Sequence, residues 1–281
     1  MGVTNWADPL ATGYCLVTVT RQVPVINWSN SGTSTCDDEV VAEIPVALTY
    51  NRHSHVVMML TPSALEDFAI GFSLTEGIIR TASDVTEINI LQRENGLELA
   101  MTINEECYSR LAGQRRNLVG RTGCGLCGAE SLDQAMRNPA AVTSLVSVKA
   151  TALQTAVNSL NAHQPLQVIT GAVHGAAWCN TEGVILALRE DVGRHNALDK
   201  LIGHLITSGF DPAAGFVLIS SRASYEMVYK TAATGIEVLV AVSAPTTLAI
   251  DFANRSGITL VGFARPGRHN VYTFENRILV G

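Results

Sequence analysis

The spacing of hydrophobic and polar positions differs between the two halves of the chain. In the first half, the apolar stretches EIPVALTY and HVVMML flank a polar turn at 51–54, and VTEINILQR and LELAMTI flank the turn formers ENG, so two β-hairpins are predicted. Between the hairpins, TPSALEDFAIGFSLTEG has apolar residues at helical spacing. It predicts a core-facing helix with Thr61 as N-cap and Pro62 as the first helical residue. We expect this helix to end at the glycine of LTEGII.

The second half alternates between short apolar runs and helical stretches. The runs GVILALR, GFVLISS, EVLVAVSA and ITLVGFA have the length of strands, and helices are expected to begin near Asp191, Arg222 and Pro245. This alternation predicts crossover connections and a sheet covered by helices, an α/β arrangement.

These patterns predict three regions. Residues 1–40, which include the turn formers of NWSNSGTSTCDD, are expected to be an irregular, poorly packed leader. Residues 41–145 are expected to form a β-rich lobe, and residues 146–281 an α/β lobe. Because no linker or repeat separates the two lobes, we expect them to interlock.

Composition limits the classes of function. The chain has 281 residues, 47% hydrophobic and 16% charged, which is ordinary for a soluble globular enzyme. A formal charge of -6 gives no reason to expect nucleic acid as a partner. No apolar run approaches the roughly 20 residues of a membrane span, and no signal peptide is recognisable, so a cytoplasmic location is expected.

The stretch RTGCGLCGAE places Cys124 and Cys127 in a CxxC motif with three nearby glycines. A structural zinc site needs four ligands, and the chain has no second CxxC. A zinc deaminase needs an upstream H-x-E, which is absent. The glycines favour a mobile loop, and the upstream Arg115, Arg116 and Arg121 favour thiolate over thiol. The residues alone leave a redox couple, metal binding and sulfur carriage open, the first two ahead of the third.

Four polar loops follow the predicted strands of the second half. EDVGRHNALDK, residues 190–200, contains His195, and SSRASYEMVYK places Ser220 and Arg222 at a helix N-terminus that suits an anionic group. SAPTTLA indicates a helix start. FARPGR combines Phe263 with two arginines and could hold a base and phosphates.

Each loop also has a structural interpretation: a capped, salt-bridged helix, ordinary serine caps, and Phe263 as the last core residue of its strand. Four such loops at one sheet edge nevertheless predict a small-molecule cleft. His174, alone among small residues, is expected to be a buried, hydrogen-bonded histidine.

Five motifs resemble one known family in content and order. They are GFSLTEGII, GRTGCGLCG, REDVGRHNALDKLIG, SSRASYEMVYKTAATGIEVLVAVSAPTTLA and GITLVGFARPGRHNVY, and the resemblance, from about Glu43 to about Thr273, is to the FdhD family of formate dehydrogenase accessory sulfurtransferases. It implies a fold like that of cytidine deaminase. It also implies that a cysteine desulfurase supplies sulfur as a persulfide, and that the sulfur passes to molybdenum in bis(molybdopterin guanine dinucleotide) before insertion into formate dehydrogenase. A homodimer is also implied.

The resemblance assigns roles to particular residues. The persulfide cysteine falls on Cys124, with Cys127 as the second thiol, and no metal ligand is expected. A guanine nucleotide should act as a partial mimic of the cofactor. Ala172, where the family usually has a glycine, affects only local backbone shape. The alternatives are a non-enzymatic cofactor-binding chaperone and a thiol redox protein. The expected cofactor-binding residues are Phe263, Ala264, Arg265, Pro266, Gly267 and Arg268, together with Ser220, Arg222 and His195.

Overall fold

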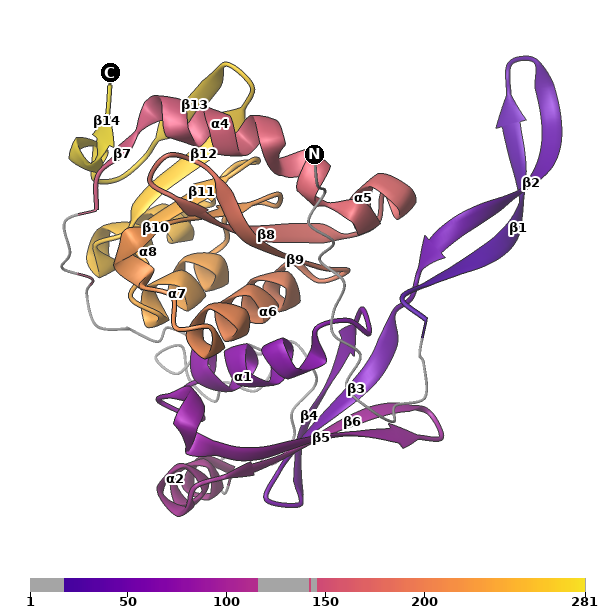
Figure 1. Cartoon of the computed structure of the whole chain (residues 1–281), viewed down its shortest axis with the longest axis vertical. Coiled ribbons are helices and arrows are strands. Elements are labelled where there is room, and N and C mark those ends of the chain that lie inside the picture. The colour runs from indigo at the N-terminus through magenta and orange to yellow at the C-terminus, as the bar shows by residue number, and fades with distance from the viewer. Residues whose placement is uncertain (1–17, 116–141, 143–145, 281) are drawn as a thin grey trace, which may run out of the picture.

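The computed structural model describes residues 18–115, 142 and 146–280, which form a mixed α/β fold (Figure 1). The α/β class predicted from the sequence is confirmed. A six-stranded sheet with helices on both faces makes up the C-terminal lobe, and a four-stranded sheet with α1 and α2 makes up the N-terminal lobe. Within the described part of the chain, no helix is both long enough and apolar enough to cross a membrane.

The six-stranded sheet has the order β13-β12-β11-β10-β8-β9. Strands β10, β11 and β12 are parallel, β8 is antiparallel to both β10 and β9, and β13 is antiparallel to β12. The carboxyl ends of β9, β10, β11 and β12 therefore meet at one edge, together with the start of β8. The strands are β8 (His174–Asn180), β9 (Ile185–Asp191), β10 (Gly215–Ile219), β11 (Val238–Ala241), β12 (Thr259–Arg265) and β13 (Arg268–Val271).

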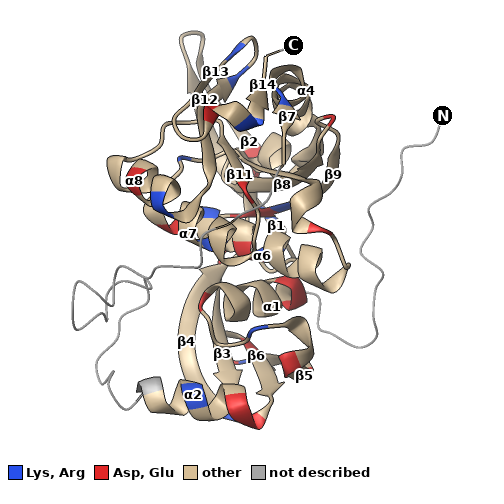
Figure 2. Cartoon of the chain, turned by 90° about the vertical axis from the view of Figure 1, so that its left-hand side faces the viewer, with Lys and Arg blue, Asp and Glu red and all other residues tan. Residues whose placement is uncertain are grey.

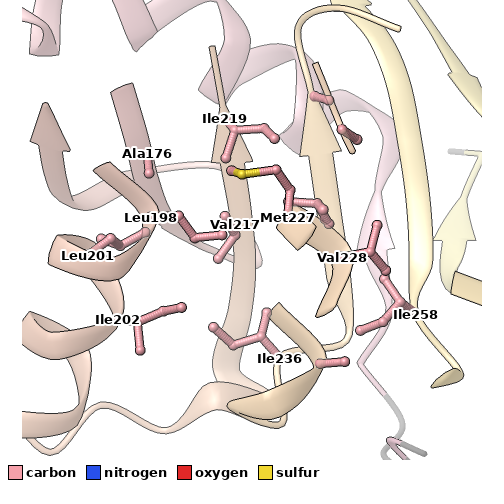
Figure 3. Packing of buried hydrophobic residues seen from close by; sticks show 14 of the residues in the cluster. Ala176, Leu198, Leu201, Ile202, Val217, Ile219, Met227, Val228, Ile236 and Ile258 are labelled. Atoms are coloured by element: carbon pink, nitrogen blue, oxygen red, sulfur yellow. The ribbon is translucent and has the colours of Figure 1, made fainter. Parts of the chain in front are cut away.

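Both faces of this sheet are buried, which explains its continuous apolar runs. In β10, Val217 and Ile219 pack toward α6 (Arg194–Thr207), α7 (Tyr225–Ala233) and α8 (Thr247–Ser256), as Figure 3 shows for part of this cluster. The alternate residues Phe216 and Leu218 pack on the opposite face with α4 (Ala150–Leu160). The four strands predicted for the second half are confirmed.

The N-terminal lobe contains the two predicted hairpins. They are β3 (Ile44–Tyr50) with β4 (His53–Leu60), and β5 (Val85–Arg93) with β6 (Gly96–Ile103), joined in the order β4-β3-β6-β5. Asn51 and Arg52 both have positive φ, 47° and 68°, as a tight two-residue hairpin turn requires. The sheet packs its buried face on α1 (Leu65–Thr75) and α2 (Glu105–Arg115).

The predicted start of α1 is wrong. The helix begins at Leu65, after Ala64 in the left-handed conformation, and Thr61 is not its N-cap. Thr61 instead contacts the C-terminal lobe: its backbone N–H donates to Asp191 Oδ2 (3.0 Å) and its Oγ1 accepts from the N–H of Val192 (3.1 Å). These tertiary hydrogen bonds use the groups that a capping residue would have offered to the helix.

The two lobes meet where α1 crosses α6. Gly71 and Gly203 allow a backbone-to-backbone approach: a methyl group at Gly71 would overlap the carbonyl oxygen of Asp199, and one at Gly203 would overlap that of Asp67. The helices therefore pack directly on each other, as seen at the centre of Figure 1.

The predicted irregular leader is only partly right. Within it, β1 (Thr20–Ser29) and β2 (Gly32–Val41) form an antiparallel hairpin, in which only Asn30 and Ser31 make the turn and most of the turn formers pair in register within the strands. Ile26 and Trp28 are 76% and 73% exposed, and the hairpin projects from the body (Figure 1).

Short elements complete the fold. The strands β7 (Val148–Lys149) and β14 (Ile278–Leu279) pair in parallel and bring the end of β14 beside the start of α4. Within the described residues, the remaining helices are α5 (Pro165–Thr170) and the 3-10 turns η1 (Ala82–Asp84), η2 (Asn161–His163), η3 (Pro212–Ala214) and η4 (Glu275–Arg277).

Candidate functional site

A groove of about 700 Å³ opens at the carboxyl edge of the six-stranded sheet. Residues of α4, α5 and their connection form one wall, and the ends of β10 and β12 with the start of β8 form the other. The sequence predicted a cleft at this edge, because ligands of open α/β sheets bind at the loops that follow the carboxyl ends of the strands. Among its lining residues are the predicted Ser220, Ala264, Arg265 and Pro266.

The end of β12 is distorted at Phe263. The pairing of β12 with β13 shifts register between Gly262 and Arg265, and Phe263 has a φ of 50°, which is uncommon for a bulky residue. Its side chain is 37% exposed, so the interpretation of Phe263 as a last core residue is wrong. Strained backbone of this kind is typical of functional sites, and here it turns an aromatic ring toward solvent.

Two arginines face each other beyond Phe263. Arg265 on β12 pairs with Arg268 on β13, so their side chains project from the same face of the hairpin end. The turn between them uses Gly267, with φ 80°, and its N–H donates to Gln154 Oε1 on α4 (2.8 Å). Figure 2 shows Lys and Arg positions at this end of the molecule. Like charges opposite each other destabilise a strand pair, and a bound anion would relieve that repulsion.

The loop after β10 is tied to β8. Ser220 accepts a hydrogen bond at Oγ from the N–H of Gly175 (2.9 Å), and its own N–H donates to the Gly175 carbonyl (2.9 Å). This fixes the Ser220 side chain at the groove. Arg222 is exposed and does not line the groove.

His174 is a partly buried groove residue, whereas a buried, hydrogen-bonded histidine was expected. It begins β8, and because β8 runs antiparallel to β10 its start lies at the groove edge. Partial burial lowers the pKa of His174, and the positive charges of Arg194 and His195 lower it further. Arg194 and His195 therefore lie close to this wall of the groove, although His195 does not line it.

The polar run at 190–200 is not a solvated helix face. Asp191, Asp199 and Lys200 are each at most 1% exposed. Lys200 Nζ lies 2.7 Å from Asp191 Oδ2 and donates to the Thr61 carbonyl (2.9 Å), so this pair holds the two lobes together.

A second buried pair lies at the same lobe interface. Lys230 Nζ on α7 donates to Asp199 Oδ2 (2.9 Å), Thr75 Oγ1 (2.9 Å) and Glu76 Oε1 (3.3 Å). Burial alone would lower the pKa of Lys230, but the negative charges of Asp199 and Glu76 outweigh it and raise that pKa. Thr75 and Glu76 belong to the GFSLTEGII motif, which therefore serves the lobe contact.

Glu190 supports the wall of the groove that α4, α5 and their connection form. Its two carboxylate oxygens accept from the N–H groups of Leu166 and Gln167 at the start of α5, both at 2.9 Å. Burial raises the pKa of Glu190 above its ordinary value, although these hydrogen bonds act in the opposite direction. The residue anchors α5, which places Gln167 in the groove lining.

The predicted site residues thus fall into four groups, one of which is Arg222, exposed and outside the groove lining. Ser220, Ala264, Arg265 and Pro266 line the groove. Phe263, Gly267 and Arg268 lie on the same hairpin, and His195 lies near His174. Cys124 and Cys127 lie outside the described residues.

Several groove residues were not predicted from the sequence. Gln164 and Gln167 enter the site because α5 packs over the sheet edge, and a lone glutamine gives no local signal for this. Glu226 was also missed, although it lies within 2.8 Å of His195, because the two residues are on different helices.

The fold and the groove define a mixed α/β protein with an arginine-flanked groove at the carboxyl edge of its sheet. The FdhD/NarQ family model matches residues 41–279, and the chain belongs to this family. The resemblance found in the motifs is thereby confirmed.

Individual relatives are similar over most of their length. A protein of Cupriavidus necator named sulfur carrier protein FdhD is 54% identical over 254 residues, 90% of this chain and 88% of that protein. A protein of the same name from Bordetella petrii is 47% identical, over 88% of this chain and 89% of its own. A crystal structure from Desulfotalea psychrophila, assigned as a formate dehydrogenase accessory protein, has a TM-score of 0.75 at 25% identity, and covers 93% of this chain and 100% of that one.

Proposed function

We propose that this protein is a sulfurtransferase of formate dehydrogenase maturation. Cys124 accepts sulfur as a persulfide from a cysteine desulfurase, and the sulfur passes to the molybdenum of bis(molybdopterin guanine dinucleotide), which is bound as substrate. Family membership and the names of the relatives support the sulfur-carrier role and the link to formate dehydrogenase.

The observation that carries the proposal is the arginine pair at the rim of the groove. Arg265 and Arg268 face each other, next to the outward-turned Phe263. Guanidinium groups bind phosphate oxygens bidentately, and an exposed aromatic ring offers a stacking surface for a base. The residues present therefore fit the guanine dinucleotide end of the cofactor, and Ser220 and His174 line the same groove.

The chain's own residues have distinct tasks in this proposal. Arg265 and Arg268 hold the pyrophosphate, Phe263 stacks on the guanine, and backbone groups near Pro266 and Gly267 select the base edge. His195 exchanges protons with sulfur groups. We also infer a cytidine deaminase-like arrangement for the C-terminal lobe; the mixed sheet with helices on both faces is compatible with it.

Cysteine labelling tests the sulfur-transfer step. Intact mass spectrometry after incubation with desulfurase and cysteine should show one added sulfur on Cys124, and Cys124→Ser should abolish both the label and dehydrogenase activation. Cys36→Ser is the matched control, because Cys36 is an exposed free thiol on the β1–β2 hairpin. Burial raises the pKa of Cys179, which makes that thiol unreactive.

Other outcomes would identify the alternatives. Cofactor binding without any sulfur on Cys124 would favour a non-enzymatic chaperone. A reversible disulfide between Cys124 and Cys127 as the active form would favour a thiol redox protein. Light scattering of the purified protein tests the expected homodimer.

A further inference from the structure

His195 and Glu226 form a hydrogen-bonded pair between two helices. His195 is the second residue of α6 and Glu226 the second residue of α7, and His195 Nδ1 lies 2.8 Å from Glu226 Oε2. The two side chains are only 28% and 25% exposed. Burial by itself would raise the pKa of Glu226, but the hydrogen bond and charge of His195, together with Lys230, outweigh it and lower that pKa. Glu226 is therefore a carboxylate that accepts a hydrogen bond.

The other ring nitrogen of His195 has no such partner. Its Nε2 is buried and makes no hydrogen bond to any described residue. A neutral imidazole carries its proton on one nitrogen and a lone pair on the other. With a carboxylate at Nδ1, the proton belongs on Nδ1 and the lone pair on Nε2.

We propose that Glu226 is a positioning residue that holds His195 in the Nδ1–H tautomer, so that Nε2 is the basic nitrogen. This inference rests on the proposed sulfur-transfer function. When a thiolate attacks the outer sulfur of a persulfide, the S–S bond breaks and the inner sulfur leaves as a thiolate. Neutral Nε2 can remove the proton from the attacking thiol. The protonated Nε2 can then return that proton to the leaving thiolate, so no net proton is gained or lost.

The position of the pair is consistent with this role. His174 lines the groove and pairs with Asp191 at the end of β9, four residues before His195. A purely structural bond between α6 and α7 would not require an unpartnered Nε2. It would also leave the rate of sulfur transfer unchanged as long as the two helices stay together.

Nitrogen NMR of the full-length protein with labelled histidine measures the tautomer directly, at a pH where the imidazoles are neutral. We expect the Nδ1–H form in the unmodified protein and in Glu226→Gln, since the amide oxygen still accepts the hydrogen bond. Glu226→Ala should shift His195 toward the Nε2–H form. His163 is an internal control, because a backbone carbonyl, that of Ser159, lies 2.8 Å from its Nδ1 and is unaffected by the substitution.

Single-turnover sulfur transfer supplies the functional readout. Glu226→Ala should slow transfer by at least about tenfold, and by no more than the roughly 10²- to 10⁴-fold that general acid–base catalysis contributes in full. Glu226→Gln should retain more activity. His195→Ala should lose as much as the double variant, since the two residues act as one unit.

The results separate this inference from the proposed function. An unchanged tautomer in Glu226→Ala, or an unchanged transfer rate with a folded protein, would overturn the role of Glu226. If Glu226→Ala does not fold, Glu226→Gln decides: loss of the Nδ1–H form while the amide is in place would refute the assignment. Failure of Cys124 to take up sulfur in the unmodified protein would refute the sulfur-carrier function and leave the tautomer result standing.

Discussion

Lys230→Met should destabilise the protein strongly while leaving the groove residues unchanged. The Lys230 side chain is 7% exposed, and its ammonium group contacts both oxygens of Asp199 as well as Thr75 and Glu76. Methionine replaces the stem of the side chain and removes only the charge. Among the described residues, only the hydrogen bond from Thr75 Oγ1 (2.8 Å) then remains for the Asp199 side chain, which is 2% exposed.

The expected loss follows from this uncompensated charge. Removing one partner of a buried ion pair costs about 3–5 kcal/mol, whereas losing a single hydrogen bond to a charged group costs about 1.5–3 kcal/mol. Since Lys230 makes several such contacts, we expect the larger value. Replacing both members of the pair with apolar residues, Lys230→Met with Asp199→Leu, should recover much of it, because no buried charge is left.

Urea denaturation at neutral pH measures the free energy of unfolding. Arg93→Met is the matched control: it breaks the Arg93–Glu98 pair (2.7 Å), whose arginine side chain is 56% exposed, and should change stability by about 1 kcal/mol or less. A Lys230→Met loss no greater than that of the control would refute the argument.

The pH dependence of Lys230→Met provides an independent check. Burial already raises the pKa of Asp199, and removal of the lysine raises it further. When folding raises the pKa of a carboxyl group, the folded protein loses stability as the pH increases. The loss occurs between the pKa of the unfolded state, about 4, and the higher pKa of the folded state. The variant should therefore come closer to the unmodified protein as pH falls from 7 to 5. A constant difference over that range would show that Asp199 carries no buried charge.

Three further substitutions test other features. Gly203→Ala should lose about 1–3 kcal/mol in the same denaturation assay, because the new methyl group meets the backbone of Asp67, whereas Gly113→Ala on α2, with open space around it, should not destabilise. Phe263→Ala should weaken binding of guanosine diphosphate by about 1–3 kcal/mol in calorimetry, while Phe263→Tyr keeps both affinity and preference over the adenosine analogue; equal affinity for the two bases in the unmodified protein would contradict guanine recognition here. Trp28→Ala should change the unfolding free energy by about 0.5 kcal/mol or less, since this residue is 73% exposed, and a larger loss would show that the hairpin packs on the body.

The hydrophobic pattern predicted the strands in which successive residues are all buried. β10 was found because Phe216, Val217, Leu218 and Ile219 are all buried, which gives a continuous apolar run. β8 was not predicted, because HGAAWCN is composed largely of small residues with little strand propensity, and its pairing with β9 and β10 decides its conformation. The β1–β2 hairpin was missed because its turn formers suggested irregular structure.

The site residues that lie at strand ends and in the following loops could be predicted from the sequence. Arg265 ends β12 and Ser220 follows β10, and the carboxyl ends of these strands share an edge, so the pattern of strands and polar loops was sufficient. His174 lies at the same edge because it begins β8, which is antiparallel to β10. Glu226 contacts His195 from a neighbouring helix. Both depend on tertiary pairing, which local patterns do not encode.

The motifs that carry the family resemblance have two physical tasks, and only one of them is chemical. GFSLTEGII supplies Gly71, Thr75 and Glu76 to the lobe contact, where they meet Asp199 and Lys230 from two other motifs. Substitutions at these residues should abolish activity by destabilising the packed lobes, on which the shape of the groove depends. Loss of activity is therefore informative about sulfur transfer only for variants whose unfolding free energy is unchanged, a condition that the exposed Phe263, Arg265 and Arg268 can meet and the buried Asp199 and Lys230 cannot.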